Sequence, residues 1–375
     1  MRTHLVASFA LALTLATVSV GSAVITTQPL GPTLTPEDLV SQLLGAGVTV
    51  SNVTVRGCPA GMGTFVDPAA SVGLASGIIL SSGDIAAMVG PNKSPDTSTS
   101  CGVEGDPDLD KLVPESATQD AAVLEFDFVP TNPQLAINFV FASEEYNEFV
   151  GSRFNDVFAF FVNGANAALV PGVQLPISVN NVNAATNALF YVPNDSPGTY
   201  DVEADGFTVV LTVRASVNAG QTNHIKIAIA DVSDANYDSS IFLQASGVSS
   251  TPADVAVQAK GTTLIVDCNS GATGKGLGTC AATGFAIVPG GSGAVATEAS
   301  VIKVPTGLTA VTKSVTRKFN KKGRAKLRLN LNSTGKATLR RAGSLDMLVV
   351  VEVTDRQGHP VDFQSVNHVV KKSRH

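Results

Sequence analysis

Acidic side chains gather in two short segments that lie beside apolar, strand-like runs. The first segment follows the run Leu135–Phe141, and the second lies between Ile225–Ile229 and Ile241–Leu243. Carboxylates clustered at strand ends can bind Ca²⁺, a hard cation that takes roughly six to eight oxygen ligands in flexible geometry. Asp and Asn also favour turns for local reasons, so turn formation is the competing interpretation. The candidate calcium ligands are Glu144, Glu145, Asp156, Asp231, Asp234 and Asp238.

A third acidic run contains Asp106, Asp108 and Asp110. It is not an EF-hand loop, because Lys111 stands at the sixth position, where glycine is required, and Ala117 stands at the twelfth, where glutamate is required. Calcium binding and simple turn formation both stay open for this run.

An enzymatic interpretation starts from the same carboxylates. A glycoside hydrolase needs two of them on either side of the scissile bond, and Glu144, Glu145, Glu148 and Asp156 are the available residues. Adjacent Glu144 and Glu145 would point to opposite faces of a strand, and the chain has no Trp on which a sugar ring could stack. A serine triad would have only His224 in this region, without a G-x-S-x-G elbow. The sequence favours a non-enzymatic binding module, with a secreted carbohydrate-active enzyme or a glycan-binding module as the alternative.

The elements around these acids have the patterns of β-strands. Apolar residues alternate with carboxylates in Leu124–Phe128, as expected for a half-buried antiparallel strand. One helix is expected after Thr35, with Pro36 in its first turn and Gly45 at its end. We predict an all-β fold, with a jelly-roll or sandwich-like acidic domain that has one short N-terminal helix, followed by a smaller immunoglobulin-like β-sandwich. The expected strands are Val48–Val55, Ile78–Leu80, Leu124–Val129, Leu135–Phe141, Val157–Val162, Phe207–Val213, Ile225–Ile229, Ile241–Leu243, Ala325–Leu331 and Leu348–Val353.

The first 23 residues have the pattern of a secretory signal peptide. An apolar run from Leu5 to Val20 follows Arg2, and the small residues Gly21 and Ala23 suit signal peptidase. The run is shorter than the roughly 20 residues that a membrane-spanning helix needs. We therefore expect cleavage after residue 23 and a secreted, extracellular protein, with or without association with the cell surface.

Four cysteines follow this segment, and an even count in an exported chain predicts disulfides. We expect the pairs Cys58–Cys101 and Cys268–Cys280, each within its own region. A zinc site with four cysteine ligands is the alternative, but no C-x-x-C pair is present.

Charge divides the chain near Thr251. Residues 24–251 contain 24 acidic and 6 basic side chains, a net charge of −18, whereas residues 252–375 contain 7 acidic and 18 basic side chains, a net charge of +11. We therefore expect an acidic domain at 24–250 and a basic tail domain at 251–375.

The basic residues of the tail indicate which kinds of partner the protein could bind. Arg317-Lys318, Lys321-Lys322 and Arg340-Arg341 suit an anionic polymer, although a solvated basic face is the commoner reason for such pairs. The acidic domain could also dock on this tail, within or between molecules. For a secreted protein we expect a cell-surface glycan, a cell-wall polyanion or a protein partner rather than nucleic acid.

Several short motifs follow one another along residues 35–247: Gly77–Gly83, Phe141–Gly164, Val170–Gly172, Val179–Asn183, Asp205–Thr208, Ile229–Asp231 and Tyr237–Ser239. Through these motifs, residues 35–247 resemble the choice-of-anchor L family of bacterial surface and secreted proteins. The resemblance implies a location more than an activity, because its members share this domain but differ in their C-terminal anchoring signals, and no catalytic activity is established for it. This chain shows no recognisable sorting signal; its tail resembles β-sandwich modules at the ends of exported actinobacterial proteins.

Overall fold

The computed structural model describes residues 24–44, 48–245, 254–269, 277–288, 308–356 and 360–371. Several expected features lie outside the described residues: the signal peptide at 1–23, the helix end at Gly45 and the boundary near residue 251. No described helix is long and apolar enough to cross a membrane.

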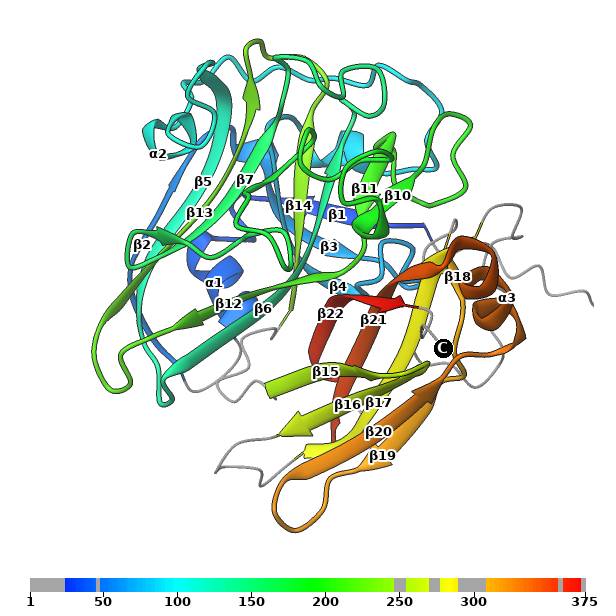
Figure 1. The fold of residues 1–375 in the computed structure, drawn as a ribbon. Helices are drawn as coiled ribbons and strands as arrows, with labels where there is room; N and C mark the ends of the chain where they lie inside the picture. Colours follow the sequence, from blue (N-terminus) through cyan, green and yellow to red (C-terminus); the bar gives the residue numbers. More distant parts are fainter. Residues whose placement is uncertain are drawn as a thin grey trace, which may run out of the picture.

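Two antiparallel sheets account for the described strands before residue 245 (Figure 1). The eight-stranded sheet has the order β1-β3-β4-β14-β6-β11-β10, and β12 also pairs with β6. Its strands are β1 (Thr26–Pro29), β3 (Met62–Val66), β4 (Ser76–Ser81), β6 (Gln134–Ser143), β10 (Tyr191–Pro193), β11 (Gly206–Thr208), β12 (Leu211–Ser216) and β14 (Ser239–Gln244). The six-stranded sheet has the order β2-β5-β13-β7-β8, with β9 on β7. Its strands are β2 (Thr49–Arg56), β5 (Thr118–Val129), β7 (Val157–Val162), β8 (Ala165–Asn166), β9 (Ile177–Ser178) and β13 (Asn223–Val232).

The two sheets face each other across a core rich in phenylalanine, which confirms the predicted sandwich. Phe139 of β6 and Phe158 of β7 join the two sheets, with their ring centroids 5.3 Å apart. Helix α1 (Pro36–Leu44) adds its buried apolar residues to the same core. Its first turn is capped as predicted, because the Thr35 hydroxyl accepts from the Asp38 N–H at 3.3 Å and the Asp38 carboxylate accepts from the Thr35 N–H at 2.9 Å.

One expected strand is interrupted. The segment Phe207–Val213 forms β11 and β12, which pair with different stretches of β6. The break falls at Val209, whose N–H donates to the Phe190 carbonyl at 2.8 Å instead of to β6. The alternation of apolar residues continues across the break, so the sequence pattern alone does not reveal it.

The basic part also consists of two antiparallel sheets. The three-stranded sheet contains β15 (Asp254–Lys260), β16 (Thr263–Asn269) and β20 (Arg324–Asn330), and the five-stranded sheet contains β17 (Leu277–Ile287), β18 (Leu308–Ala310), β19 (Val315–Lys318), β21 (Ser344–Asp355) and β22 (Pro360–Lys371). The disulfide Cys268–Cys280 joins β16 to β17 and therefore links the two sheets, as the predicted pairing requires. In β20, exposed and buried residues alternate as expected.

Helix α3 (Ser333–Ala342) was not expected from the sequence, which predicts no helix beyond the N-terminal one. Its signals are nevertheless local: the Asn332 side chain accepts from the Gly335 N–H at 2.9 Å, and Gly343 ends the helix in the left-handed conformation. The apolar runs of the strands on either side are stronger sequence signals than these two caps, so the sequence pattern does not reveal the helix.

Strand β21 is buried on both faces, which explains its nearly continuous apolar sequence. Met347 and Val349 belong to the core between the two tail sheets, whereas Leu348 and Val350 pack into the hydrophobic cluster of the acidic part. The two oppositely charged parts therefore meet through an apolar contact, and β22 lies beside β12 and β6 at this junction (Figure 1).

Candidate functional site

Three neighbouring strands of the eight-stranded sheet have an acid at the same edge. Strand β6 lies between β14 and β11; Glu144 directly follows β6, Asp238 directly precedes β14 and Asp205 directly precedes β11. The antiparallel register extends to these acids, because the Glu144 N–H donates to the Asp238 carbonyl at 3.1 Å. Three carboxylates therefore stand on neighbouring chains, where like charges destabilise a sheet.

The six-stranded sheet contributes two more acids to this edge. Asp156 directly precedes β7, and the register of β7 with β13 places Asp231 opposite it. One Asp156 oxygen accepts from the Val232 N–H at 2.9 Å, and the other accepts from the Ser239 hydroxyl at 2.7 Å. Because Ser239 belongs to the other sheet, Asp156 connects the two layers of the sandwich.

The structure brings together five of the six acids that the sequence suggests as calcium ligands. We call these five residues the strand-end cluster; each is at most 1% exposed, and they are Glu144, Glu145, Asp156, Asp231 and Asp238. The sixth, Asp234, is half-buried in the loop between β13 and β14, where its carboxylate accepts from the Asn236 N–H at 3.1 Å. Asp234 still lies near enough to Glu145 to raise the pKa of that side chain.

Many carboxylate oxygens of the strand-end cluster are buried without a hydrogen-bond partner. They are both oxygens of Glu144, both of Asp231, Oδ1 of Asp238 and Oε2 of Glu145. Within the described residues, no ion pair involves any of the five acids. Buried carboxylates in proteins are normally paired, bound to a metal or protonated. The cluster therefore needs either protons or a cation from outside the chain.

The acids are not arranged as a finished metal site. In the described part of the chain, no group of three His, Cys, Asp or Glu side chains is positioned to hold a metal ion. A cation at this edge would therefore also take backbone or hydroxyl oxygens, which Ca²⁺ accepts, or would turn the carboxylates towards itself.

Burial is the main reason that the pKa of every acid in the strand-end cluster is raised. The pKa rises to about 10 for Glu144, about 9 for Glu145, about 8 for Asp156 and about 6 for Asp238, and lies well above its ordinary value for Asp231. Repulsion between neighbouring carboxylates adds to the effect of burial. The nearby Ser82 hydroxyl lowers the pKa of Asp231 somewhat, but it does not reach hydrogen-bonding geometry with either oxygen.

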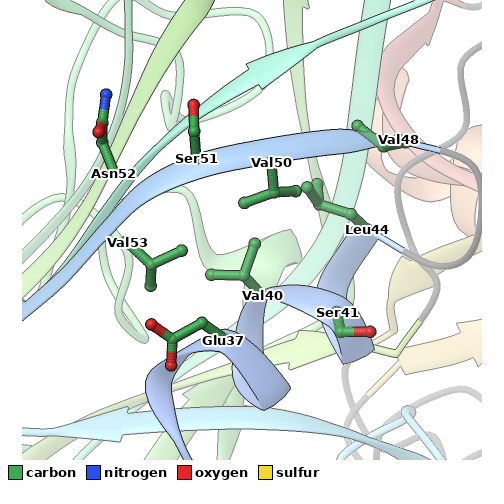
Figure 2. Close-up of a pocket in the computed structure, with 9 residues that line it drawn as sticks. All are labelled: Glu37, Val40, Ser41, Leu44, Val48, Val50, Ser51, Asn52 and Val53. Atoms are coloured by element: carbon green, nitrogen blue, oxygen red, sulfur yellow. The ribbon is translucent and has the colours of Figure 1, made fainter.

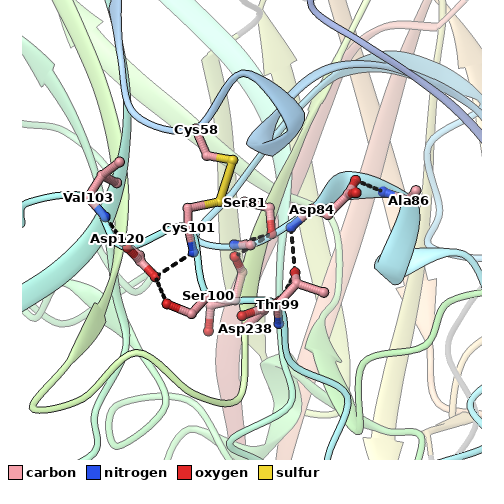
Figure 3. The surroundings of a disulfide bond; sticks show 12 residues. Cys58, Ser81, Asp84, Ala86, Thr99, Ser100, Cys101, Val103, Asp120 and Asp238 are labelled. Carbon is pink, nitrogen blue, oxygen red and sulfur yellow. Dashed lines mark hydrogen bonds between the residues drawn. A yellow bond between two sulfur atoms is a disulfide. The ribbon is translucent and has the colours of Figure 1, made fainter.

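A disulfide holds the loop that covers the cluster (Figure 3). Cys58 and Cys101 are bonded as predicted, with their Cα atoms 5.7 Å apart. Two residues before Cys101, Thr99 donates its N–H at 2.9 Å and its hydroxyl at 2.7 Å to Oδ2 of Asp238. A Cβ atom on Gly83 would lie 1.9 Å from the same oxygen, so only glycine fits there. The loop and its disulfide thus fix one carboxylate of the cluster.

The third acidic run has a different role. Asp106 caps the short helix α2 (Pro107–Asp110), because its Oδ1 accepts from the Asp108 N–H at 3.0 Å. Lys226 of β13 lies 2.8 Å from carboxylate oxygens of both Asp106 and Asp108, and Arg56 lies 2.5 Å from Asp106. Helix capping and ion pairing by the chain's own cations therefore account for this run.

Other residues considered in the sequence are also accounted for. His224 lies half exposed on β13, with Nδ1 2.9 Å from Asp127 and Nε2 3.3 Å from Glu125. Glu148 is exposed. Because the four cysteines form two disulfides, they do not form a zinc site.

Two concave surfaces occur among the described residues, and the second includes Asn155 and Val232, the chain neighbours of Asp156 and Asp231. A pocket of about 440 Å³ between α1 and β2 is lined by residues that include Glu37, Val40 and Val50 (Figure 2). An open groove of about 660 Å³ includes Arg153 and Asn180 among its lining residues. Neither surface is lined by a member of the strand-end cluster.

Glu203 and Asp205 are not among the ligands predicted from the sequence, although both are buried next to Glu144. A signal was available, because Asp205 directly precedes a strand just as Asp156 and Asp238 do. It was missed because β11 has three residues and gives little periodicity.

Comparison with known proteins identifies one family. The family model described as choice-of-anchor L domain matches residues 26–249. None of the curated proteins compared with the chain matches it significantly.

Similarity to solved structures is weak. A β-glucuronidase from Ruminococcus gnavus in complex with uronic isofagomine is 11% identical over 66% of this chain and 35% of that one, with a TM-score of 0.18. The apo structure of a β-glucuronidase from the same organism is 11% identical over 84% of this chain and 46% of that one, with a TM-score of 0.19. The chain spans about a third of the length of the first structure. Such low TM-scores carry no argument about this chain.

Proposed function

The chain belongs to the choice-of-anchor L domain family, and from this premise we propose that it is a non-enzymatic module of the bacterial cell surface or secreted matrix, stabilised by Ca²⁺. The family suggests a surface-associated or secreted protein. Calcium binding is the part of the proposal that the residues of this chain support directly.

The observation that carries the proposal is the strand-end cluster. Five acids from both sheets are buried at one edge, many of their oxygens lack partners, and no ion pair among the described residues involves them. A divalent cation would replace the repulsion between these carboxylates with attraction to a common charge. Among biological cations, Ca²⁺ suits this set because it binds oxygen ligands in flexible numbers and geometries.

Calcium at this edge would connect elements that are distant in sequence. Glu145 follows β6, Asp156 precedes β7, Asp231 ends β13 and Asp238 precedes β14. One cation could therefore hold the ends of four strands from both layers of the sandwich. Outside a cell, where calcium is abundant, the domain would be rigid, as suits a module that presents a binding surface. We retain Asp234 as a rim ligand for the same ion.

Isothermal titration calorimetry of the mature chain with CaCl₂ tests this proposal. We expect saturable binding at micromolar to millimolar calcium, weakened by Asp231→Asn and unchanged by Asp346→Asn, which alters an exposed acid in the tail. Magnesium should bind more weakly, because it demands a stricter octahedral geometry. A calcium titration without binding heat, combined with no protection from unfolding, would remove calcium from the proposal.

An enzymatic function is tested separately. If the chain were a glycoside hydrolase using Glu144 or Glu145, a screen of polysaccharides would show release of reducing ends that Glu144→Gln or Glu145→Gln abolishes. We expect no release from the wild-type chain, because both carboxylates are buried. The basic tail remains a candidate contact for a cell-surface glycan, a cell-wall polyanion or a protein partner.

A further inference from the structure

A β-hairpin of the tail carries a dense set of exposed cations. It consists of β19, β20 and the turn between them, which lies at the bottom of the view in Figure 1. Residues 317–328 contain seven Lys and Arg and no Asp or Glu. All seven side chains are exposed, and they are Arg317, Lys318, Lys321, Lys322, Arg324, Lys326 and Arg328. The hairpin therefore concentrates positive charge where solvent and partners can reach it.

Strand β20 places three of these cations in one row. Leu327 and Leu329 are buried in the core between the two tail sheets, so the residues that alternate with them point to the outer face. Arg324, Lys326 and Arg328 therefore follow one another along this face with a spacing of about 7 Å.

The turn adds two cations at one end of the row. The side-chain oxygen of Asn320 accepts from the Lys322 N–H at 2.9 Å and from the Arg324 N–H at 3.1 Å. Gly323 has a φ of 68°, a conformation that glycine adopts at little cost. Lys321 and Lys322 are therefore presented by a hydrogen-bonded turn that is continuous with the row.

The chain leaves most of these charges unpaired. Among the described residues, Lys326 is the only one of the seven with an ion pair, at 3.2 Å from Asp267 on the neighbouring strand β16. The two side chains are 61% and 42% exposed, so the pair contributes little. The acidic part does not face the row, because β21 contacts that part through Leu348 and Val350, whereas β20 covers the opposite side of the tail core.

Protection of a sheet edge explains only part of this pattern. Strand β20 is an edge strand of the three-stranded sheet, and charged residues on edge strands prevent pairing with other chains. One or two charges on the strand would serve that purpose. The pairs Arg317-Lys318 and Lys321-Lys322 lie outside β20, so edge protection of this strand does not account for them.

We propose that the β19–β20 hairpin binds a linear phosphodiester polymer of the bacterial cell envelope, with the polymer lying along Arg324, Lys326 and Arg328. Guanidinium groups bind phosphate oxygens in bidentate fashion, and lysines add point charges. The spacing of the row is comparable to that of phosphates joined by a three-carbon linker. Strands β15, β16 and β20 contain no aromatic residue on which sugar rings or bases could stack, which favours a polymer recognised by its backbone charge.

This inference goes beyond the proposed function, because neither the acidic part nor calcium takes part in it. Binding to a polymer of the envelope would hold the module at the cell surface through charge. The acidic part would remain available for other contacts.

Isothermal titration calorimetry of the wild-type chain with poly(glycerol phosphate), in chelator and at several salt concentrations, tests this proposal. A variant in which Gln replaces the three cations of the row, Arg324→Gln, Lys326→Gln and Arg328→Gln, should bind about tenfold more weakly. Its slope of log affinity against log salt should be smaller by about 2, because three phosphate contacts are lost. Circular dichroism shows whether the variant is folded, and the turn variant Lys321→Gln, Lys322→Gln tests the hairpin independently if it is not.

A matched control removes the same charge elsewhere in the tail. Lys336, Arg340 and Arg341 are exposed on helix α3, and their combined replacement by Gln also removes three cations. This variant should bind poly(glycerol phosphate) nearly as tightly as the wild type. Equal losses in the row variant and the α3 variant would overturn the proposal, because net charge alone would then set the affinity.

The other outcomes identify the partner. Polygalacturonate, a carboxylate polymer with sugar rings in its backbone, should bind more weakly than poly(glycerol phosphate) at the same salt concentration, and equal or tighter binding would overturn the choice of a phosphodiester. Self-association of the wild-type chain in sedimentation experiments, lost in the row variant and without polymer binding, would show that the hairpin binds the acidic part of a second copy instead. A lack of polymer binding would overturn this inference and leave the calcium proposal untouched.

Discussion

Two groups of acids lie in the same β-sandwich, and they differ in whether the chain supplies cations to pair with them. Near α2, Lys226 forms ion pairs with both Asp106 and Asp108, and Arg56 forms a second ion pair with Asp106. In the strand-end cluster the described residues supply no ion pair, and six carboxylate oxygens have no hydrogen-bond partner. The charges of the first group are paired within the chain, whereas those of the second can be neutralised only by protons or by added cations.

The pKa values of Asp108 and Asp156 shift in opposite directions for this reason. Hydrogen bonds from Lys111 and Lys226 lower the pKa of Asp108 to about 2, although partial burial opposes them. Burial raises the pKa of Asp156 to about 8. An acid that is paired with a cation of the chain therefore stabilises the folded state at neutral pH. A buried acid without such a partner destabilises it, and an external ligand can remove that destabilisation.

The largest effect is expected from breaking the internally paired group. Lys226→Met should lower the free energy of unfolding by about 3 kcal/mol, because Asp106 stays buried and keeps only Arg56. Lys111→Met is the matched control, because Lys111 is largely exposed and its pair with Asp108 contributes little. Urea unfolding at neutral pH measures both. The loss should be the same with calcium and with chelator; a calcium-dependent loss would contradict the separation of the two groups.

A smaller loss is expected from crowding the strand-end cluster. Gly83→Ala places a Cβ atom 1.9 Å from Oδ2 of Asp238 and 2.4 Å from Oγ1 of Thr99, so the covering loop must move. We expect destabilisation of about 2 kcal/mol and weaker calcium binding. Gly31→Ala is the matched control, because a Cβ atom on Gly31 would meet no atom within 4 Å and the backbone there is not in the left-handed region. If Gly83→Ala binds calcium as the wild type does, Asp238 is not a ligand.

The effect of Asp231→Asn should change sign with the cation. In chelator the substitution removes a buried charge that repels its neighbours, so the variant should be about 1 kcal/mol more stable than the wild type, or at least as stable. In calcium it removes a ligand and should be about 1–2 kcal/mol less stable. Chemical unfolding of both proteins in both buffers measures the reversal. Destabilisation of equal size in the two buffers would indicate a structural role for Asp231 without calcium.

Stability should also depend on pH in opposite directions through Asp108 and through the acids at the strand ends. The folded-state pKa values of Asp238, Asp205 and Asp156, about 6, 7 and 8, lie above the ordinary value of 3.8. Their contribution in chelator is therefore fully present below about pH 4 and is lost as the pH rises through 6 to 8. For Asp108 the pKa is lowered, so its contribution is present above pH 3.8 and is lost as the pH falls towards 2. Melting temperatures measured from about pH 4 to pH 8 should fall with rising pH in chelator but not in calcium.

Much of the fold was predictable because the strands are amphipathic or uniformly apolar. The alternation in Leu124–Phe128 and Ala325–Leu331 and the apolar run Val157–Val162 correspond to β5, β20 and β7. Helix α3 was missed because its signals are the caps at its ends rather than a long apolar period.

The site was predictable only in part. The acids next to long strands could be found, because Glu144 and Asp231 adjoin unmistakable apolar runs. Asp205 was missed although it also precedes a strand, because that strand is very short, and only the register of β11 with β6 shows that it lies beside Glu144. Sequence also does not reveal which acids have cationic partners: Lys226 is 120 positions from Asp106 in the chain, yet they form an ion pair.

Thermal unfolding of the wild-type chain in calcium and in chelator tests the central claim most directly. With free calcium about a hundredfold above the dissociation constant, one site adds about 2.7 kcal/mol to the stability of the folded state. For a domain of this size, that stabilisation corresponds to a rise in melting temperature of roughly 5–10 °C. Melting curves that coincide at neutral pH would contradict the account and would mean that the strand-end cluster is neutralised by protons alone.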